Sequence, residues 1–314
     1  MKVGVVDVHI SVVNTNNRDL LERCLSSLPD ACAHVAWQAT VVDNASSDGS
    51  AELVAEQFPW ALLMRNSERE GFSANHNKVI LPVVSDRTAR YVLILNEDTE
   101  LAPRCVAKLV ECADRDPRVG AVGPRIQGPH GEYEQSFFPF PSLASEVQAT
   151  LLPGRRRRSG SPRTGWLNGS CILTSADALT EIGSLDERFF IFFEDTDLGR
   201  RLADAGRPSV LCEEAVIIHL GHRTVSKQPG ARMEQQMLRS RYLYFRKHHG
   251  RPTAEIVSTF VRAALALRAA KAAVAGLVGR DADERQLGRL LLQLARYSPS
   301  RPLEHELASR GVPT

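Results

Sequence analysis

The sequence predicts an α/β fold in which a mostly parallel sheet is flanked by helices. Short β-branched runs alternate with helical patterns through the first half of the chain, and one run, at 91–96, is apolar on both faces. From about Arg232 onward the chain is rich in Ala, Arg and Leu, which indicates a helical C-terminal extension. We therefore assign residues 1–228 to the α/β domain and residues 229–314 to the extension.

The expected elements alternate between the two periodicities along the chain. Strands are expected at 9–14, 39–44, 61–64, 91–96, 119–123, 166–175 and 210–219. Helices are expected at 20–28, 46–58 and 73–84, from Pro103, from Ser175, and at 196–205. Residues 128–164 carry several Pro and Gly and four arginines at 155–158, which predicts a mobile loop.

The composition excludes several classes of function. With 39 Lys plus Arg against 37 Asp plus Glu, the net charge of +2 gives no reason to expect a nucleic-acid partner. The six cysteines contain no C-x-x-C pair, so we expect free thiols in a reducing compartment and no zinc cluster. No signal peptide is evident, and no stretch approaches the ~20 continuous apolar residues of a membrane-spanning helix. These features predict a soluble, cytoplasmic protein.

Polar side chains follow three neighbouring strands at the point where each strand ends. They are Asn14, Thr15, Asn16 and Asn17 after the first strand, Asp43, Asn44, Ser46 and Asp48 after the second, and Asn96, Glu97 and Asp98 after the strand at 91–96. Ligands on parallel sheets bind at the carboxyl ends of the strands. The sequence therefore predicts a ligand-binding rim. The fingerprint G-x-G-x-x-G is absent after the first strand, which excludes a dinucleotide oxidoreductase.

Part of this rim has the chemistry of a metal site. Mg²⁺ and Mn²⁺ take carboxylate oxygens and substrate phosphates, so Asp98, with Glu97, is a candidate ligand. The alternative is that Asp98 and Thr99 cap the next turn. His219 ends the last expected strand, close to His222, and is a candidate metal ligand or phosphate donor; a structural histidine is the alternative.

A second acidic cluster stands at the start of an expected helix. Glu194, Asp195 and Asp197 follow the aromatic run at 189–193. One carboxylate at a helix N-terminus is explained by the helix dipole. Three of them beside an apolar wall suggest a shielded carboxylate that acts as a general base toward a hydroxyl.

Seven blocks of the sequence, taken in order, resemble the family-two glycosyltransferases. The blocks are VVNTNN, VVDNASSDGS, EGFSANHN, LILNEDT, LNGSCILTS, GSLDERFFIFFEDTDLGRRL and IIHLGH. They cover about residues 11–225, and the ordered set is far more specific than any single block. The resemblance implies the GT-A fold, and the likeness is strongest to the bacterial rhamnosyltransferase-like branch.

The resemblance also implies roles for individual residues. The donor side would be formed by Asn14, Thr15, Asn16, Asp43, Ser46, Gly71, Phe72, Asn75, Asn77 and Asn96, with Asp43 holding a uracil or thymine base. The Mg²⁺ or Mn²⁺ ion would be held by Asp98, with Glu97 and His219 beside it. Asp195 would be the catalytic base with Glu194 next to it, and the acceptor would lie beside Trp166, Asn168 and Gly169.

Two positions depart from the family pattern. The aspartate motif is commonly Asn-Pro-Asp or Asp-x-Asp, but this chain has Asn96-Glu97-Asp98, which leaves the role of Glu97 open. Thr15 stands where relatives usually carry an aromatic residue, which leaves open whether the base stacks there.

The resemblance implies an inverting, metal-dependent glycosyltransferase. It would move a sugar, rhamnose by family likeness, from a dTDP or UDP donor to a hydroxyl of a glycan, a glycolipid or a natural product. The alternative is a catalytically inactive nucleotide-sugar-binding scaffold, against which the intact Asp98 and Asp195 argue. A nucleotide-sugar pyrophosphorylase would need a glycine-rich phosphate loop that residues 14–18 do not provide.

The C-terminal stretch at 255–278 suggests a membrane partner. It places Arg262, Arg268 and Lys271 among apolar residues, as helices that bind membrane surfaces do. One hypothesis therefore sets this stretch, together with the arginines at 155–158, at the inner face of a membrane. The other is an ordinary helix packed on the catalytic domain.

Overall fold

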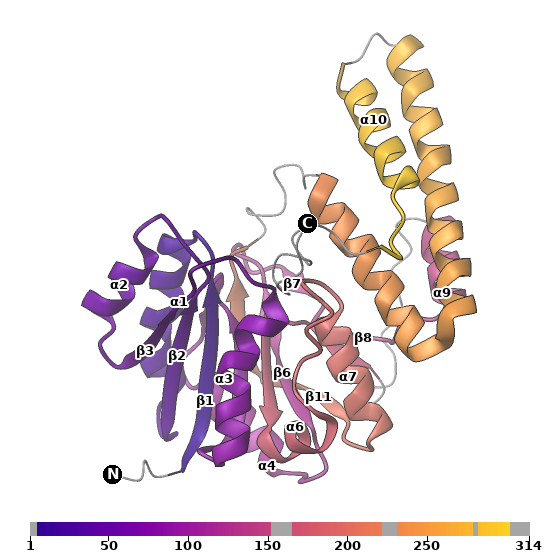
Figure 1. Ribbon diagram of the computed structural model, residues 1–314. Helices are drawn as coiled ribbons and strands as arrows, with labels where there is room; N and C mark the ends of the chain where they lie inside the picture. Colours follow the sequence, from indigo (N-terminus) through magenta and orange to yellow (C-terminus); the bar gives the residue numbers. More distant parts are fainter. Residues whose placement is uncertain (1–4, 152–164, 222–230, 279–281, 302–314) are drawn as a thin grey trace. The chain divides into compact units, whose positions relative to one another are not determined.

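The computed structural model describes residues 5–151, 165–221, 231–278 and 282–301 (Figure 1). The chain divides into two compact units. The first comprises the described residues of 1–140, 158–187 and 194–225, and the second those of 141–157, 188–193 and 226–314. The expected domain boundary, between 228 and 229, stays a prediction; the last division between the two units falls between 225 and 226. The arginines at 155–158 and His222 lie outside the described residues.

A mixed sheet forms the centre of the first unit. Its strands are β1 Val6–Asn14, β2 Trp37–Asp43, β3 Ala61–Arg65, β4 Ala89–Asn96, β5 Thr99–Leu101, β6 Ala121–Gln127, β7 Tyr133–Glu134, β10 Cys171–Ser175 and β11 Ser209–His219. They are ordered β3-β2-β1-β4-β10-β6-β11-β5, with β7 paired to β6. A separate two-stranded sheet pairs β8 Phe137–Phe138 with β9 Trp166–Leu167.

The register of the first four strands aligns their polar ends. These strands run parallel, with Asn14 opposite Asp43 and Val13 opposite Asn96. β10 runs antiparallel to β4 and to β6, so the sheet is parallel in its first half and mixed in its second. Because β10 begins at the edge where β4 ends, the residues just before Cys171 join the same rim.

Helices cover both faces of this sheet (Figure 1). One face carries α1 Arg18–Ala31, α2 Ser50–Gln57 and α4 Cys105–Asp114, and the other carries α3 Phe72–Asp86, α6 Ala176–Ile182 and α7 Glu194–Asp204. Within β4, Leu93 and Leu95 pack on the first face while Val92 and Ile94 pack on the second. The expectation that this strand is apolar on both faces is confirmed, as is the α/β fold flanked by helices.

Two expectations differ from the structure. Residues 166–175 were expected to form one strand, but they divide into β9 and β10 because the Asn168 side chain accepts a hydrogen bond from the Ser170 amide (2.9 Å) and turns the chain. The stretch at 128–164, expected to be loose, contains β7, β8 and the helix α5 Leu143–Leu151. The strands β7 and β8 have two residues each and leave no periodic pattern, whereas the nine-residue helix α5 was missed.

The second unit is helical, as expected for the C-terminal extension. It contains α5, a long helix α9 Ala231–Val278 and α10 Ala282–Arg296. α9 bends at Gly250, which has φ 82° and ψ 164°, and Pro252 follows. Phe189, Tyr244 and Phe245 form the centre of a small aromatic core.

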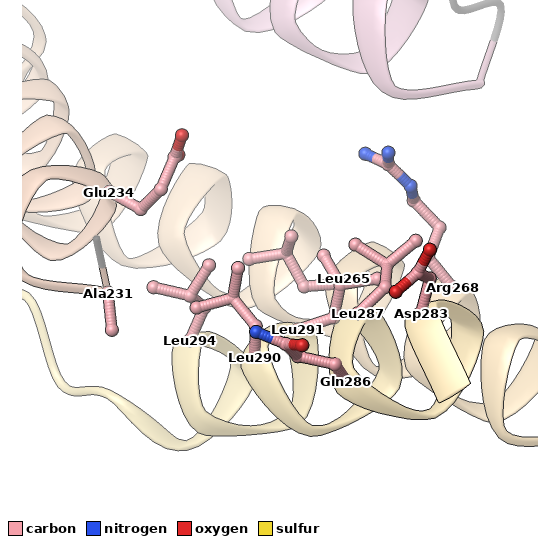
Figure 2. Close-up of a pocket in the computed structure, with 10 residues that line it drawn as sticks. All are labelled: Ala231, Glu234, Leu265, Arg268, Asp283, Gln286, Leu287, Leu290, Leu291 and Leu294. Carbon is pink, nitrogen blue, oxygen red and sulfur yellow. The ribbon is translucent and has the colours of Figure 1, made fainter. Parts of the chain in front are cut away.

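α10 packs beside the second half of α9, and a cavity of about 520 Å³ opens along this pair (Figure 2). Its apolar lining comes from Leu265, Leu287, Leu290, Leu291 and Leu294, with Glu234 and Arg268 among the polar residues. Within the described ranges, every helix is too short or too polar to cross a bilayer.

Candidate active site

The ends of β1 and β2 carry a cluster of interlocked polar groups. The side-chain amide of Asn14 donates to Asp43 Oδ1 (3.4 Å) and to the Ser46 hydroxyl (3.2 Å), and the backbone N–H of Ser46 donates to Asp43 Oδ2 (3.1 Å). Asn16, at φ 54°, donates its backbone N–H to the same hydroxyl (3.0 Å). Since the Ser46 oxygen accepts two hydrogen bonds here, its own hydrogen is directed elsewhere. Asn14 Oδ1 is buried without a partner among the described residues, so this oxygen can accept a hydrogen bond from a ligand.

A network of side-chain hydrogen bonds holds the loop after β3 against this polar cluster. Asn44 donates to Thr15 Oγ1 (3.2 Å) and to the carbonyl of Glu70 (3.1 Å), and its own oxygen accepts from the Glu70 amide (2.8 Å). Lys78 joins the network by donating to Asn66 (2.7 Å) and to the Glu70 carboxylate (2.6 Å). The loop is therefore fixed by side chains from α3 and from the end of β2.

The four donor-side candidates after this loop divide into two groups. Gly71 and Phe72 begin α3 beside the loop, with the ring of Phe72 4.4 Å from that of His76. Asn75 and Asn77 are buried, and their side chains are bonded within the protein. Asn75 donates to the Gly71 carbonyl (3.0 Å), whereas Asn77 both donates to and accepts from the backbone of Leu185 (2.9 and 3.1 Å). We propose that these two amides shape the donor loop.

Asp98 lies beside His219 at the adjoining part of the rim. β5 pairs with β11, and the Leu220 amide donates to the Asp98 carbonyl (2.7 Å). This pairing brings His219 Nε2 to 3.5 Å from Asp98 Oδ2, while His219 Nδ1 lies 3.2 Å from Glu134 Oε2. Burial lowers the pKa of His219, but the two carboxylates outweigh it and raise this pKa to about 9.

Glu97 points into the rim beside β1. Its carboxylate accepts a hydrogen bond from the side chain of Asn17 (2.7 Å). Burial and the neighbouring charge of Asp98 raise the pKa of Glu97 to about 7, although the bond from Asn17 works in the opposite direction. At neutral pH a substantial fraction of Glu97 is therefore protonated and uncharged.

Asp98 and His219 fit a divalent cation. Asp98 Oδ1 is buried with no hydrogen-bond partner among the described residues. Asp98 does not cap a helix, because the strand β5 begins directly after it at Thr99. A Cβ at Gly221 would stand 1.7 Å from Asp98 Oδ2, so the glycine makes room for this carboxylate. In the described ranges no three His, Cys, Asp or Glu side chains form a complete metal site. Mg²⁺ is usually held by one or two carboxylates together with substrate phosphates, so Asp98 is the main ligand candidate and His219 a secondary one.

Asp195 is held by three hydrogen-bond donors at the start of α7. Its Oδ2 accepts from the Gly169 amide (3.0 Å), and its Oδ1 accepts from the amide and hydroxyl of Thr196 (2.6 and 3.1 Å). The residue as a whole is half-buried. Burial raises the pKa of Asp195 to about 6, against the lowering effect of these hydrogen bonds. A carboxylate with this pKa is well matched to proton transfer near neutral pH.

The other two carboxylates of α7 have different surroundings. Glu194 is buried, and burial together with the charge of Asp195 raises its pKa well above the ordinary value, which favours the protonated form. Asp197 is fully buried and forms an ion pair with Arg201 (2.7 Å), whose guanidinium also donates to the carbonyls of Ile182 and Gly183. Of the three residues, Asp195 is therefore the least buried.

Removing the buried charge of Asp197 should destabilise the fold. Asp197→Ala leaves the guanidinium of Arg201 without its carboxylate, and we expect the free energy of unfolding to fall by about 3–5 kcal/mol. Asp204→Ala, which breaks the exposed pair with Arg200 on the same helix, should change it by less than about 1 kcal/mol. Urea denaturation of both variants measures the difference. Equal losses would contradict a structural role for Asp197.

Of the acceptor-side candidates, Gly169 contacts Asp195, and Trp166 packs against Gly199 further along α7. Trp166 stacks on Phe138 with ring centroids 4.6 Å apart, and Gly169 contributes the amide that binds Asp195. The side chain of Asn168 is bonded to the turn before β10. The Asn96 amide donates to the Ser170 carbonyl (2.9 Å), so this turn connects the rim of β4 to the base candidate.

Sequence reasoning gave no individual role to Asn17 and missed Glu134. Asn17 was expected in the polar rim after β1, and the structure adds that its side chain donates to Glu97. Glu134 lies on β7, which pairs with β6 through Ile126. Its two-residue strand lies in a stretch without periodicity, and nothing in the sequence indicated that its carboxylate reaches His219.

Sequence comparisons agree with this geometry. The family model described as glycosyl transferase family 2 matches residues 7–183. N-acetylglucosaminyl-diphospho-decaprenol L-rhamnosyltransferase of Mycobacterium tuberculosis is 30% identical over 272 residues, which is 79% of this chain and 87% of that protein. The O-antigen biosynthesis protein RfbC of Myxococcus xanthus is 25% identical over 243 residues, covering 73% of this chain and 18% of that protein.

Solved structures support the fold. The mannosyltransferase PcManGT from Pyrobaculum calidifontis, in complex with GDP-Man and Mn²⁺, has a TM-score of 0.54 at 18% identity, covering 93% of this chain and 86% of that one. GalNAc-T7 with UDP, GalNAc and Mn²⁺ has a TM-score of 0.50 at 14% identity, covering 81% of this chain and 54% of that one. The expected GT-A fold is confirmed. By its sequence and its fold, the chain belongs to glycosyl transferase family 2.

Proposed function

We propose that this glycosyltransferase moves a sugar from a nucleoside diphosphate to an acceptor hydroxyl with inversion at the anomeric carbon. The observation that carries the proposal is the carboxylate of Asp195. It belongs to a half-buried residue, is held by three donors, and is linked through the Gly169 turn to the rim that holds Asp98. A base placed in this way, with a proton affinity suited to neutral pH, serves a direct displacement.

Asp195 accepts the proton of the acceptor hydroxyl while the hydroxyl oxygen forms a bond to the anomeric carbon. The bond from this carbon to the diphosphate oxygen breaks, and its electron pair leaves with the diphosphate. Because attack and departure occur on opposite faces of the sugar, the configuration inverts. The raised pKa of Glu194 disfavours a second negative charge beside the base.

The nucleoside binds at the polar cluster where β1 and β2 end. The residues of this cluster are Asn14, Thr15, Asn16, Asp43 and Ser46, and the helix beside it begins with Gly71 and Phe72. Asp43 accepts only a long hydrogen bond from Asn14 at Oδ1, which leaves acceptor capacity for the imide N–H of uracil or thymine. A dTDP or UDP donor fits this chemistry. We place Asn96 on the diphosphate side, between the polar cluster and Asp98.

Asp98 and His219 are the residues that would hold Mg²⁺ or Mn²⁺, with Glu97 next to them. Such an ion offsets the negative charge that grows on the departing diphosphate. The two structural neighbours named above are both Mn²⁺ complexes, which supports the same requirement here. Asp98 and His219 contribute the oriented oxygen and nitrogen atoms, and Gly221 leaves them the space to do so.

For the sugar and the acceptor, the similar proteins give the direction. The relative from Mycobacterium tuberculosis is named as an L-rhamnosyltransferase acting on N-acetylglucosaminyl-diphospho-decaprenol. We propose rhamnose as the transferred sugar and a hydroxyl of a glycolipid as the acceptor. The Asn168–Gly169 turn contacts Asp195, and Trp166 packs against the same helix at Gly199; we propose that the two bind the acceptor sugar on an aromatic surface.

A lipid-linked acceptor agrees with a cytoplasmic enzyme that contacts the inner face of a membrane. The helices of the second unit expose Leu267, Val274 and Leu277 beside the exposed cations Arg268 and Lys271. Mixed apolar and basic surfaces of this kind bind anionic bilayers. We propose that the α9–α10 pair makes this contact.

Binding to vesicles tests the membrane contact. The protein should sediment with vesicles rich in phosphatidylglycerol and much less with phosphatidylcholine, because the cations need anionic lipid. Leu277→Glu, at a position 73% exposed, should reduce the bound fraction about tenfold. Leu62→Glu, at an exposed leucine on the sheet edge, is the matched control and should bind like wild type. Equal sedimentation of all three with both lipids would exclude a specific contact.

Calorimetric titration with UDP, dTDP and GDP tests the proposed function. In the presence of Mn²⁺, dTDP or UDP should bind at least about tenfold more tightly than without the ion, since the ion bridges protein and diphosphate. With the matching nucleotide sugar, proton NMR of the product should report the opposite anomeric configuration to that of the donor. Binding without transfer would favour the inactive scaffold, and a retained configuration would contradict Asp195 as a simple base.

A further inference from the structure

Glu134 contacts the metal-site histidine from the side opposite Asp98. β6 lies between β7 and β11, with Ile126 paired to Glu134 on one side and to Ile217 on the other. This arrangement lets the Glu134 side chain reach His219 across the end of β6. Its Oε2 lies 3.2 Å from His219 Nδ1, while Asp98 Oδ2 lies 3.5 Å from Nε2. The imidazole therefore stands between two carboxylates, one at each ring nitrogen.

The two contacts are not equivalent. The separation of 3.2 Å is within the range of an N–H···O hydrogen bond, whereas 3.5 Å is longer than such bonds normally are. The three side chains are largely buried, at 15% exposure for Glu134, 17% for Asp98 and 18% for His219, so water screens the Glu134 contact weakly. The Nδ1 hydrogen is therefore directed to Glu134, which leaves Nε2 as the ring nitrogen that faces Asp98 and would bind a cation in place of its own hydrogen.

We propose that Glu134 is a positioning residue, which accepts the Nδ1 hydrogen of His219 and fixes the ring so that Nε2 faces a cation shared with Asp98. Histidine ligands in proteins are commonly oriented in this way by a carboxylate on their second nitrogen. The inference rests on the proposed metal site. It adds to that site a residue that touches neither the cation nor the substrate.

Mn²⁺ affinity of the full chain, measured by titration in the presence of UDP, tests the role of Glu134. Glu134→Ala should weaken Mn²⁺ binding about 10–100-fold, as loss of such partners does elsewhere. Glu134→Gln retains an oxygen acceptor for the Nδ1 hydrogen and should recover part of the loss. Glu132→Gln, in the turn beside β7, is the matched control and should bind Mn²⁺ like wild type. Thermal unfolding of each variant separates a loss of fold from a loss of affinity.

A double-mutant cycle shows whether Glu134 acts through His219. In a His219→Ala background, Glu134→Ala should have no further effect on Mn²⁺ affinity, because the ring that it orients is gone. An undiminished effect there would overturn the inference, and so would unchanged affinity in folded Glu134→Ala alone. If wild type with UDP binds no Mn²⁺, the proposed metal site itself fails, which is a different result from a metal site indifferent to Glu134.

Discussion

Asp195→Asn is expected to lower kcat by about 10²–10⁴-fold while the dissociation constant of the donor nucleotide changes little. The asparagine oxygen can still accept the hydrogen bond from Gly169, but its NH₂ group then faces the amide and hydroxyl of Thr196, so thermal unfolding of the variant is measured beside its kinetics. The amide cannot take a proton from a hydroxyl. The variant therefore slows the chemical step, while the nucleotide-binding residues at the ends of β1 and β2 are unchanged. Steady-state kinetics and nucleotide titration on the same preparation measure the two effects.

The same assignment predicts a pH dependence. A base acts only when deprotonated, so at saturating donor and Mn²⁺ the wild-type kcat should fall as the pH drops through about 6, where Asp195 takes up a proton. The residual activity of Asp195→Asn should lack this acidic limb. A limb that persists in the variant would assign it to another group and remove the main argument for Asp195.

Asp204→Asn is the matched control for both measurements. It changes an exposed carboxylate at the other end of α7, where Asp204 pairs with Arg200. We expect its kcat, its acidic limb and its nucleotide affinity to match those of wild type. A common loss in both aspartate variants would indicate damage to the helix instead of removal of a base.

The sequence predicted the rim because its residues follow strand ends, and strand ends in a parallel sheet fall in one row. Asn14 and Asp43 are direct register partners, and Asn96 stands opposite Val13. No long-range information was needed, since periodicity placed the strands and the polar residues came next. The same argument could not give the direction of β10, which depends on a turn at 168–170 and on no crossover helix.

Individual roles within the acidic cluster could not be read from the sequence. Glu194, Asp195 and Asp197 are neighbours in the chain, yet one is buried and favours its proton, one is partly exposed, and one is neutralised by Arg201. These differences come from what packs around each carboxylate. In the same way, Asn75 and Asn77 have the composition of ligand contacts but bond to the backbone of Gly71 and Leu185.

Gly221→Ala is expected to disable the metal site through a single methyl group. The added Cβ would lie 1.7 Å from Asp98 Oδ2, 2.7 Å from its Cγ and 3.1 Å from His219 Nε2. Atoms cannot approach so closely, so the Asp98 carboxylate must turn away from His219. We expect Mn²⁺ affinity in the presence of UDP to fall at least about tenfold and kcat/KM to fall about 10²-fold, because small displacements of oriented groups have effects of this size.

Gly206→Ala separates this effect from the general consequence of adding a methyl group to a glycine. Gly206 has φ +72° and no atom within 4 Å of the added carbon, so the change strains the backbone without touching the site. It should lower the free energy of unfolding by about 1 kcal/mol and leave Mn²⁺ affinity unchanged. Gly221→Ala should show the reverse pattern, with most of its effect on the ion. If folded Gly221→Ala binds Mn²⁺ as wild type does, the ion is not held by the carboxylate of Asp98, and the proposed site moves elsewhere on the rim.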